Sequence, residues 1–309
     1  MSYYVKRIFS SFVTLLIIAS LTFFMMRAIP GGPFTRERQL PAQIEAALNA
    51  KYNLDAPLLV QYFDYMEGLF RLDLGPSFQI KGYSVNDIIG AGFPVSARIG
   101  IIATLVIIIL GIPIGIISAL KQNKPIDYAV MFFATLGVTI PSFVVATLFI
   151  YVFATKLGWV PTSGISSPLA YIGPVIALSG YSLSFVSRLT RSSMLEVVQQ
   201  DFIRTARANG LSEFKVIGKH ALKNALIPVI TYIGPMVAAI LTGSFVVENV
   251  FAIPGIGTRF VTSVSNRDYT MIVGVTVFYA AFYIIMVLLV DIAYSFIDPR
   301  IKLGKKRGE

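Results

Sequence analysis

Six long runs of uncharged, mostly apolar residues dominate the chain, and short polar or charged segments separate them. A helix needs about 20 apolar residues to cross the hydrocarbon core of a bilayer, and each run is about that long or longer. The pattern therefore predicts an all-α polytopic membrane protein with six transmembrane helices. The runs are Ile8–Met26, Ile99–Leu120, Tyr128–Thr155, Leu157–Ser187, Asn224–Val247 and Tyr269–Val290.

Two of these runs contain features that change the predicted bounds or fate of the helix. Glycines and prolines interrupt the start of the fourth run, so we expect this span to begin near Leu169 and the residues before it to form an external loop. The first run follows Lys6 and Arg7 as a signal peptide would, but no small-x-small cleavage pattern comes after it. We therefore expect a retained membrane anchor.

Composition and charge agree with this class. Hydrophobic residues make up 55% of the 309 residues, charged residues 14%, and the mean hydropathy is +0.73, values that exclude an ordinary soluble domain. If the amino terminus is cytoplasmic, the same face collects 16 of the 26 Lys and Arg residues, so the positive-inside rule predicts that both termini are cytoplasmic. This topology, with attraction to anionic lipid, explains the net charge of +10 without a nucleic-acid partner. The absence of cysteine excludes disulfides and thiolate metal sites.

The largest external segment, residues 31–95, contains two short amphipathic helical patterns. The first follows Pro41 and the second follows Pro57, and in each the apolar residues recur at spacings of three and four. A segment of this size cannot bury a substantial core alone. We expect it to pack on the outer mouth of the bundle, on the bilayer surface or against an external partner.

A polar, basic loop lies between the fourth and fifth spans, at about residues 190–227. One apolar stripe predicts a four-turn helix that ends at Asn209-Gly210, and Ser212 is placed to cap a second helix. The two stripes consist of Leu195, Val198, Phe202 and Ala206, then Phe214, Ile217 and Ala221. Such a helical hairpin can transmit rigid-body motion; the alternative is a solvated basic loop.

The spans offer little catalytic or ion-coupling chemistry. Charged side chains fall near the predicted span ends, which argues against an ion-driven carrier. No acid, base and nucleophile converge at membrane depth, and His220, the single histidine, lies in the cytoplasmic loop. No GxxxxGK[ST] phosphate loop occurs, so ATP would have to be bound by another polypeptide.

Small and hydroxyl residues mark a candidate translocation pathway or gate. Helix packing is the simpler explanation, since small residues allow helices to approach closely, and a weakly polar translocation route is the other. A stretch with Pro and Gly at the outer end of the fifth span could re-enter and help to seal the mouth, or simply form turns. The candidates are Thr139, Pro141, Ser142, Ser179, Ser182, Glu248, Pro254, Gly255 and Gly257.

The loop between the fourth and fifth spans reads RTARANGL and then KHALKNALIP. These motifs are similar to the EAA loop of ATP-binding-cassette (ABC) importers, and with others along the chain they resemble the B-type transmembrane subunit of oligopeptide permeases, within the binding-protein-dependent permeases. The resemblance extends over nearly the whole chain through FFMMRAIPGGPF, AKYNLDAPLLVQYFDY, FPVSARIG, IPSFVVA, TGSFVVENVFAIPGIG and IDPRIK. The chain departs from the pattern at Thr205-Ala206-Arg207, where many importer subunits carry Glu-Ala-Ala.

The resemblance implies a type I ABC importer permease fold in a bacterial inner membrane. It implies a sister C-type permease subunit, two ABC ATPase subunits that bind ATP and Mg, and an extracytoplasmic peptide-binding protein, with no cofactor in this chain. The ATPases would grip a coupling element carried over from the EAA loop: Arg204, Thr205, Ala206, Arg207, Ala208, Asn209, Gly210, Leu211 and Ser212.

The same resemblance divides the chain into a first span (1–30), an external loop (31–95), a permease domain (96–298) and a basic tail (299–309). Oligopeptides are the expected substrate. Dipeptides, nickel chelates or glutathione remain alternatives within the family, and a self-sufficient channel or facilitator is the alternative of another class.

Overall fold

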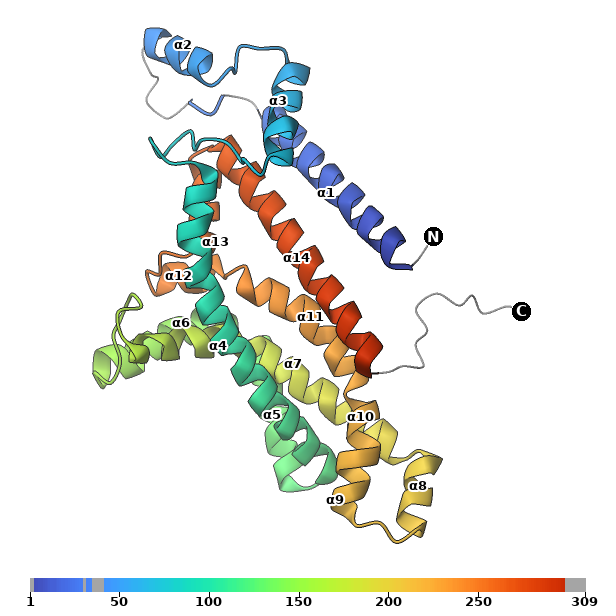
Figure 1. Ribbon diagram of the computed structural model, residues 1–309. Coiled ribbons are helices and arrows are strands. Elements are labelled where there is room, and N and C mark those ends of the chain that lie inside the picture. The colour runs from blue at the N-terminus through green and yellow to red at the C-terminus, as the bar shows by residue number, and fades with distance from the viewer. Residues whose placement is uncertain (1–2, 30–31, 35–41, 298–309) are drawn as a thin grey trace.

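The computed structural model describes residues 3–29, 32–34 and 42–297, and this part of the chain is largely helical (Figure 1). It contains five segments that are long and apolar enough to cross a membrane, and a sixth if one bent pair of helices counts as a single span. These segments correspond to the six predicted runs. The long helices are α1 (Tyr3–Ala28), α4 (Val85–Leu120), α7 (Ile172–Val198), α11 (Ile227–Leu241) and α14 (Tyr269–Ile297).

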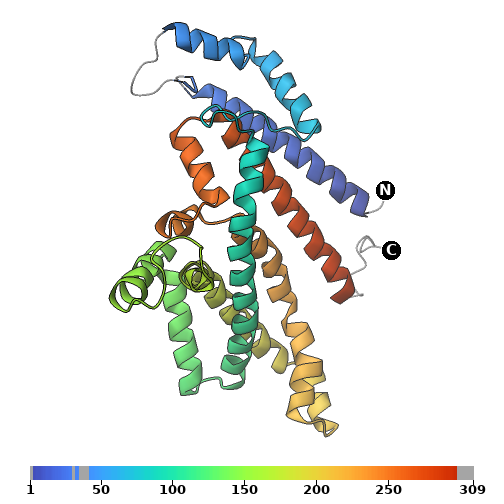
Figure 2. The ribbon, with the colours of Figure 1, turned by 60° about the vertical axis from the view of Figure 1, so that its left-hand side comes forward.

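Helix α4 begins well before the predicted second span, at Val85 instead of Ile99. Its start is fixed by a capping box, in which the Ser84 hydroxyl accepts from the Asp87 amide and the Asp87 carboxylate accepts from the Ser84 amide. The polar residues of this first turn interrupt the apolar run, so the sequence pattern placed residues 85–95 in the external loop. They extend a single helix outward from the bundle (Figure 2).

The third predicted span is the bent pair. Helix α5 (Pro125–Thr139) and helix α6 (Ser142–Phe149), which continues as a π-helical turn at Ile150–Lys156, meet at an angle of 101°. Pro141 lacks a backbone N–H, and a residue before proline avoids the helical conformation, so Ile140 is extended. The chain thus breaks completely at Pro141, and α6 then runs in a different direction from α5.

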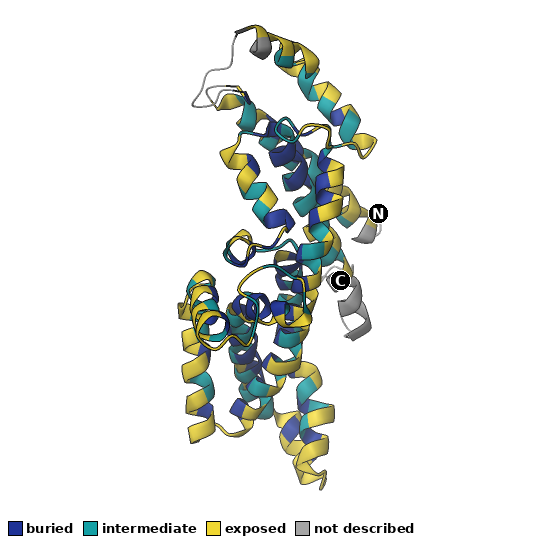
Figure 3. Cartoon of the chain, turned by 90° about the vertical axis from the view of Figure 1, so that its left-hand side faces the viewer, coloured by how far each residue is buried: buried dark blue, intermediate teal, exposed yellow. Residues whose placement is uncertain are grey.

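The core of the bundle is the α4–α7 pair, in which small residues let the two backbones approach closely. A Cβ added at Gly115 would lie 2.5 Å from the Ser187 carbonyl oxygen, and one added at Gly137 of α5 would lie 2.1 Å from Ser184 Oγ. Buried positions cluster on α4 and α7, whereas α5 and α6 expose much of their surface (Figure 3). These serines of α7 therefore serve helix packing.

The external segment folds into the two predicted helices, α2 (Ala42–Lys51) and α3 (Leu58–Phe70). Helix α3 packs on the bundle through Met66, which contacts α1 at Ala19 and α14 at Val273. Pro41 and the tail 299–309 lie outside the described residues. The Tyr3 end of α1 and the Ile297 end of α14 point away from α2 and α3 (Figures 1 and 2).

Candidate functional site

A helical hairpin projects from the end of the bundle where α4 ends and α5 begins (Figures 1 and 2). It begins with α8 (Asp201–Ala208), turns at residues 209–212 and returns through α9 (Glu213–Lys215), the π-helical segment Val216–Ala221 and α10 (Leu222–Ala225). The nine coupling residues expected from the sequence all lie in α8 or in this turn.

The first arm of the hairpin differs from the predicted four-turn helix. Helix α7 runs on to Val198, and the chain then breaks at Gln199-Gln200 before α8 starts. Because of this break, Ile203 and Ala206 face inward and pack on Met194, while Phe202 is exposed. The prediction that Phe202 belongs to the apolar stripe was wrong. Residues at spacings of three and four share one face only within a continuous helix, and the break separates α7 from α8.

The turn between the arms requires glycine. Gly210 has φ +77° and donates its amide to the Arg207 carbonyl oxygen at 2.9 Å, in agreement with its expected role as a helix end. Across the turn, Arg207 Nε donates to Glu213 Oε1 at 2.7 Å. This bond holds the pKa of Glu213 below its ordinary value and raises the pKa of Arg207.

The second arm also departs from the prediction. The Ser212 side chain makes no capping bond, and Phe214 is 88% exposed instead of buried. The buried positions are Val216, Ala221 and Ala225, because the π-helical turn places residues five apart on one face. The apolar side chain of Phe214 therefore projects from a hairpin whose inner face is packed through these buried residues.

A second candidate site lies at Glu248, on helix α12 (Phe245–Val250), and Glu248 is 3% exposed. Its Oε1 accepts a hydrogen bond from Ser96 Oγ of α4 at 2.6 Å, and its Oε2 accepts one from the Thr258 amide at 2.9 Å. Thr258 belongs to the first turn of α13 (Ile256–Ser265), where a carboxylate satisfies free amides and complements the helix dipole. Glu248 thus joins three helices.

The glycines predicted near this gate make room for the carboxylate. A Cβ added at Gly255 would lie 2.4 Å from Glu248 Cδ, and one at Gly257 would lie 3.1 Å from Oε2. Pro254 is exposed at the edge of the cluster. The sequence reasoning named Glu248, Gly255 and Gly257 but missed Ser96. A single serine in an apolar helix gives no sign that its hydrogen-bond partner lies 152 positions away.

The structure separates the remaining pathway candidates. Thr139 and Pro141 are exposed beside the α5–α6 break and Ser142 follows it, whereas Ser179 and Ser182 are buried on α7. Thr139 donates to the carbonyl oxygen of its own previous turn at 2.8 Å. Within the described residues, no hydrogen bond joins the two groups.

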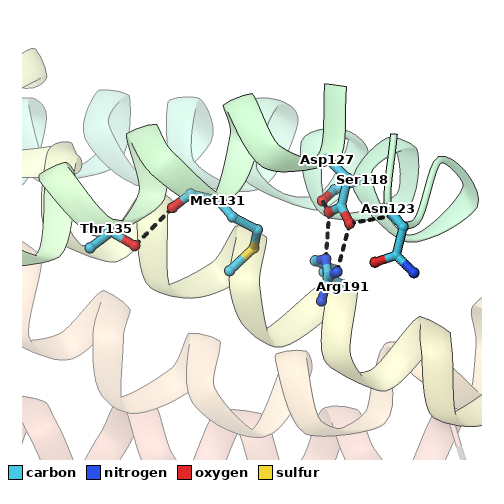
Figure 4. A network of polar contacts seen from close by, with 6 residues as sticks. All are labelled: Ser118, Asn123, Asp127, Met131, Thr135 and Arg191. Carbon is cyan, nitrogen blue, oxygen red and sulfur yellow. Dashed lines mark hydrogen bonds and ion pairs between the residues drawn. The ribbon is translucent and has the colours of Figure 1, made fainter. Parts of the chain in front are cut away.

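A buried ion pair that the sequence reasoning missed lies at the base of the hairpin (Figure 4). Arg191 of α7 donates through Nε and Nη2 to the two carboxylate oxygens of Asp127, at 2.6 and 2.7 Å. Ser118 Oγ and the Asn123 amide complete the shell of Asp127, at 2.5 and 3.0 Å. The pair ties together the ends of α4, α5 and α7, from which α8 departs.

Within the described residues, no group of three or more His, Cys, Asp or Glu side chains could hold a metal ion. The candidate site consists of an exposed hairpin, a buried ion pair at its base and a buried carboxylate among three helices.

Curated relatives match nearly the full length of the chain. The dipeptide transport system permease protein DppB of Bacillus subtilis is 49% identical over 98% of this chain and 99% of that protein. The oligopeptide transport system permease protein OppB is 46% identical in Salmonella typhimurium and 45% identical in Escherichia coli K12, each over 98% of this chain and 99% of that protein.

Solved structures support the fold. The MetNI methionine ABC transporter in inward-facing conformations has a chain with a TM-score of 0.51 and 15% identity, which covers 71% of this chain and 97% of that one. An amino acid ABC transporter with histidines gives 0.52 and 19%, over 70% and 95%. The fold is that of a type I importer permease.

Two family models divide the sequence between them. Residues 1–101 match the amino-terminal part of the binding-protein-dependent transport system membrane component, and residues 111–303 match the binding-protein-dependent transport system inner membrane component. The chain therefore belongs to the family of binding-protein-dependent transport system inner membrane components and is a permease subunit of an ABC importer.

Proposed function

We propose that this chain forms one half of the pathway of an ATP-driven importer that takes up oligopeptides. A sister C-type permease subunit supplies the other half, two ATPase subunits bind ATP and Mg, and an extracytoplasmic binding protein delivers the peptide. The full-length similarity to dipeptide and oligopeptide permeases supports peptides as the substrate class. The complex lies in a bacterial inner membrane with both termini of this chain cytoplasmic.

The observation that carries the coupling role is the exposed tip of the hairpin. Phe214 projects into solvent from a base that is packed through Ile203 and Val216. A large exposed apolar side chain on a rigid base is suited to burial in a pocket of a partner protein. The sequence has no phosphate loop, so an ATP-driven importer needs a separate ATPase subunit, and we propose that this subunit buries Phe214.

The chain itself transmits motion. When the ATPases close, they pull on α8 and the turn at Gly210, and the buried contacts of α8 pass this displacement to α7. Asp127 and Arg191 keep the ends of α4, α5 and α7 together under this load. The bundle then opens outward to accept peptide, and ATP hydrolysis by the partner subunits resets it.

The pathway needs width more than tight binding, because a route for varied peptides must release them. We place its selectivity in the binding protein. Oligopeptides are proposed over dipeptides, nickel chelates and glutathione because motifs along nearly the whole chain resemble the oligopeptide permease B-type subunit. Identifying what the binding protein retains on copurification decides among these substrates.

The experiment uses the complete transporter in liposomes and compares Gly210→Val with Gly218→Val. Both positions are open, but only Gly210 has a positive φ, so valine strains the backbone only at the turn. We expect Gly210→Val to weaken assembly or to separate peptide-stimulated ATP hydrolysis from uptake, while Gly218→Val transports normally. Unchanged transport by Gly210→Val would refute the coupling role. Liposomes that contain this chain alone should not move peptide, and uptake by them would indicate a self-sufficient channel.

A further inference from the structure

Helix α1 exposes most of its surface. It crosses the membrane over Val5–Ala28, and only 11% of its most apolar window is buried. Large side chains such as Phe9, Leu21 and Met25 are exposed. In a membrane-spanning helix, these residues meet the acyl chains of the lipid.

Helix α3 lies antiparallel along α1. Arg27 at the outer end of α1 donates to the Gln61 side chain, Ser20 and Tyr62 share a hydrogen bond of 2.7 Å, and the rings of Phe12 and Phe70 lie 6.4 Å apart. From Arg27 back to Phe12, α1 rises about 22 Å along its axis. Helix α3 therefore follows α1 over much of its length and does not stand off in the aqueous phase (Figure 2).

The surface of α3 has three stripes. One contacts the bundle through Tyr62, Tyr65, Met66 and Leu69. The second, on one flank, consists of Leu59, Phe63 and Phe70, which are 62%, 66% and 63% exposed. The third carries the charges of Asp64, Glu67 and Arg71.

The opposite flank of α3 is polar and faces a cavity of about 350 Å³. Gln61 and Asp64 line this cavity, together with Arg27 of α1 and Asp73. The flank with Gln61 and Asp64 is thus polar, and the flank with Leu59, Phe63 and Phe70 is apolar. This division is typical of an amphipathic helix that lies between an apolar and an aqueous environment.

The exposed apolar stripe of α3 is continuous with the lipid-facing surface of α1. Phe12, itself exposed, touches Phe70 and joins the two surfaces. The stripe adds three large side chains to an apolar patch that already lies in hydrocarbon. We propose that the stripe of Leu59, Phe63 and Phe70 is immersed in the hydrocarbon of the leaflet on the side opposite α8, so that α3 is a partly inserted amphipathic helix beside α1 and the occupant of its stripe is lipid.

This placement sets α3 beside α1 within that leaflet. Arg27 and the cavity it lines are at the outer end of α1 and lie at headgroup level, while the charged stripe of α3 faces away from the hydrocarbon. The proposal does not depend on the substrate or on the ATPases.

The chain has no cysteine, so single nitroxide labels can be attached without removing native thiols. The variants are Leu59→Cys and Phe63→Cys on the stripe, Glu67→Cys on the charged stripe as the aqueous control, and Leu21→Cys on α1 as the lipid control. Each is labelled in the assembled transporter in liposomes, and its collision rates with oxygen and with a water-soluble nickel chelate are compared.

We expect the ratio of oxygen to nickel collisions at positions 59 and 63 to match that at position 21 and to exceed that at position 67. A ratio like that at position 67 would mean that the stripe faces water. Low collision rates with both reagents would mean that a protein partner covers it. Either result would overturn the proposal, and neither would bear on peptide transport.

Discussion

Replacing Asp127 with alanine should destabilise the chain substantially, although the residue touches no expected substrate. The carboxylate is 2% exposed and accepts four hydrogen bonds, two of them from the Arg191 guanidinium. Removing one partner of a buried pair costs about 3–5 kcal/mol. The Arg191 side chain is 21% exposed and can regain some hydration, so we expect a loss near the lower end, about 3 kcal/mol.

The assay is equilibrium unfolding of the purified chain in mixed micelles, followed by helical circular dichroism, for Asp127→Ala, Arg191→Ala and the double variant. The free energy of coupling between the two positions should be about 2 kcal/mol or more. The matched control is the ion pair of Glu67 and Arg71, whose side chains are 61% and 74% exposed. Its removal should change stability by no more than about 1 kcal/mol.

Additive effects at positions 127 and 191, within about 0.5 kcal/mol, would show that the bidentate geometry contributes no stability. Arg191→Lys offers a finer comparison. It keeps the charge but cannot donate two parallel bonds to one carboxylate, so stability should fall between the wild type and Arg191→Ala.

Three further changes probe the packing, the tip and the turn. Gly115→Ala should lower the free energy of unfolding by about 1–3 kcal/mol, because its Cβ would lie 2.5 Å from a carbonyl oxygen of α7. The control is Gly90→Ala, which lies in open space on the same helix. In the same assay it should leave the free energy of unfolding unchanged or raise it by up to about 1 kcal/mol. Phe214→Ala should leave the stability of the chain unchanged but weaken its binding to the ATPases about tenfold or more, measured by titration. The lowered pKa of Glu213 means that its bond to Arg207 stabilises the turn above the unfolded-state pKa, and this contribution is lost as the pH falls through the folded-state pKa. The protection factors of the amides at residues 209–212, corrected for the intrinsic exchange rate at each pH, should therefore fall on acidification, and this fall should be absent in Arg207→Gln.

The spans could be predicted from the sequence because the bilayer sets a length that hydropathy reveals directly. Helix ends were harder to place. Val85 starts α4 inside a polar turn that interrupts the apolar run, and the angle of 101° at Pro141 depends on what α6 packs against after the break. Proline predicts a break in the helix but not the direction that follows it.

The helical hairpin was predicted from the sequence, but the orientation of its side chains was not. The π-helical turn at Val216–Ala221 shifts the buried face by part of a turn, so Phe214 points outward although its spacing suggests a buried stripe. Asp127 and Arg191 lie 64 positions apart at the ends of two runs. In a single sequence they look like ordinary charges at a membrane surface, and only the packing of α5 on α7 brings them together.

Helix α4 links the two ends of the molecule. Its Ser96 hydroxyl donates to Glu248 and its Ser118 hydroxyl donates to Asp127, and these two serines lie about 33 Å apart along the helix axis. Since α4 and α7 are held together at Gly115 by contacts that leave no room for a Cβ, the pair moves as one body. A displacement that reaches the Asp127 end is therefore transmitted to the Glu248 end. The helix breaks lie outside this pair, at Pro141 between α5 and α6 and at Gly243, where φ is +86° between α11 and α12. We therefore expect the opening of this importer to bend the chain at such breaks and not within the α4–α7 pair.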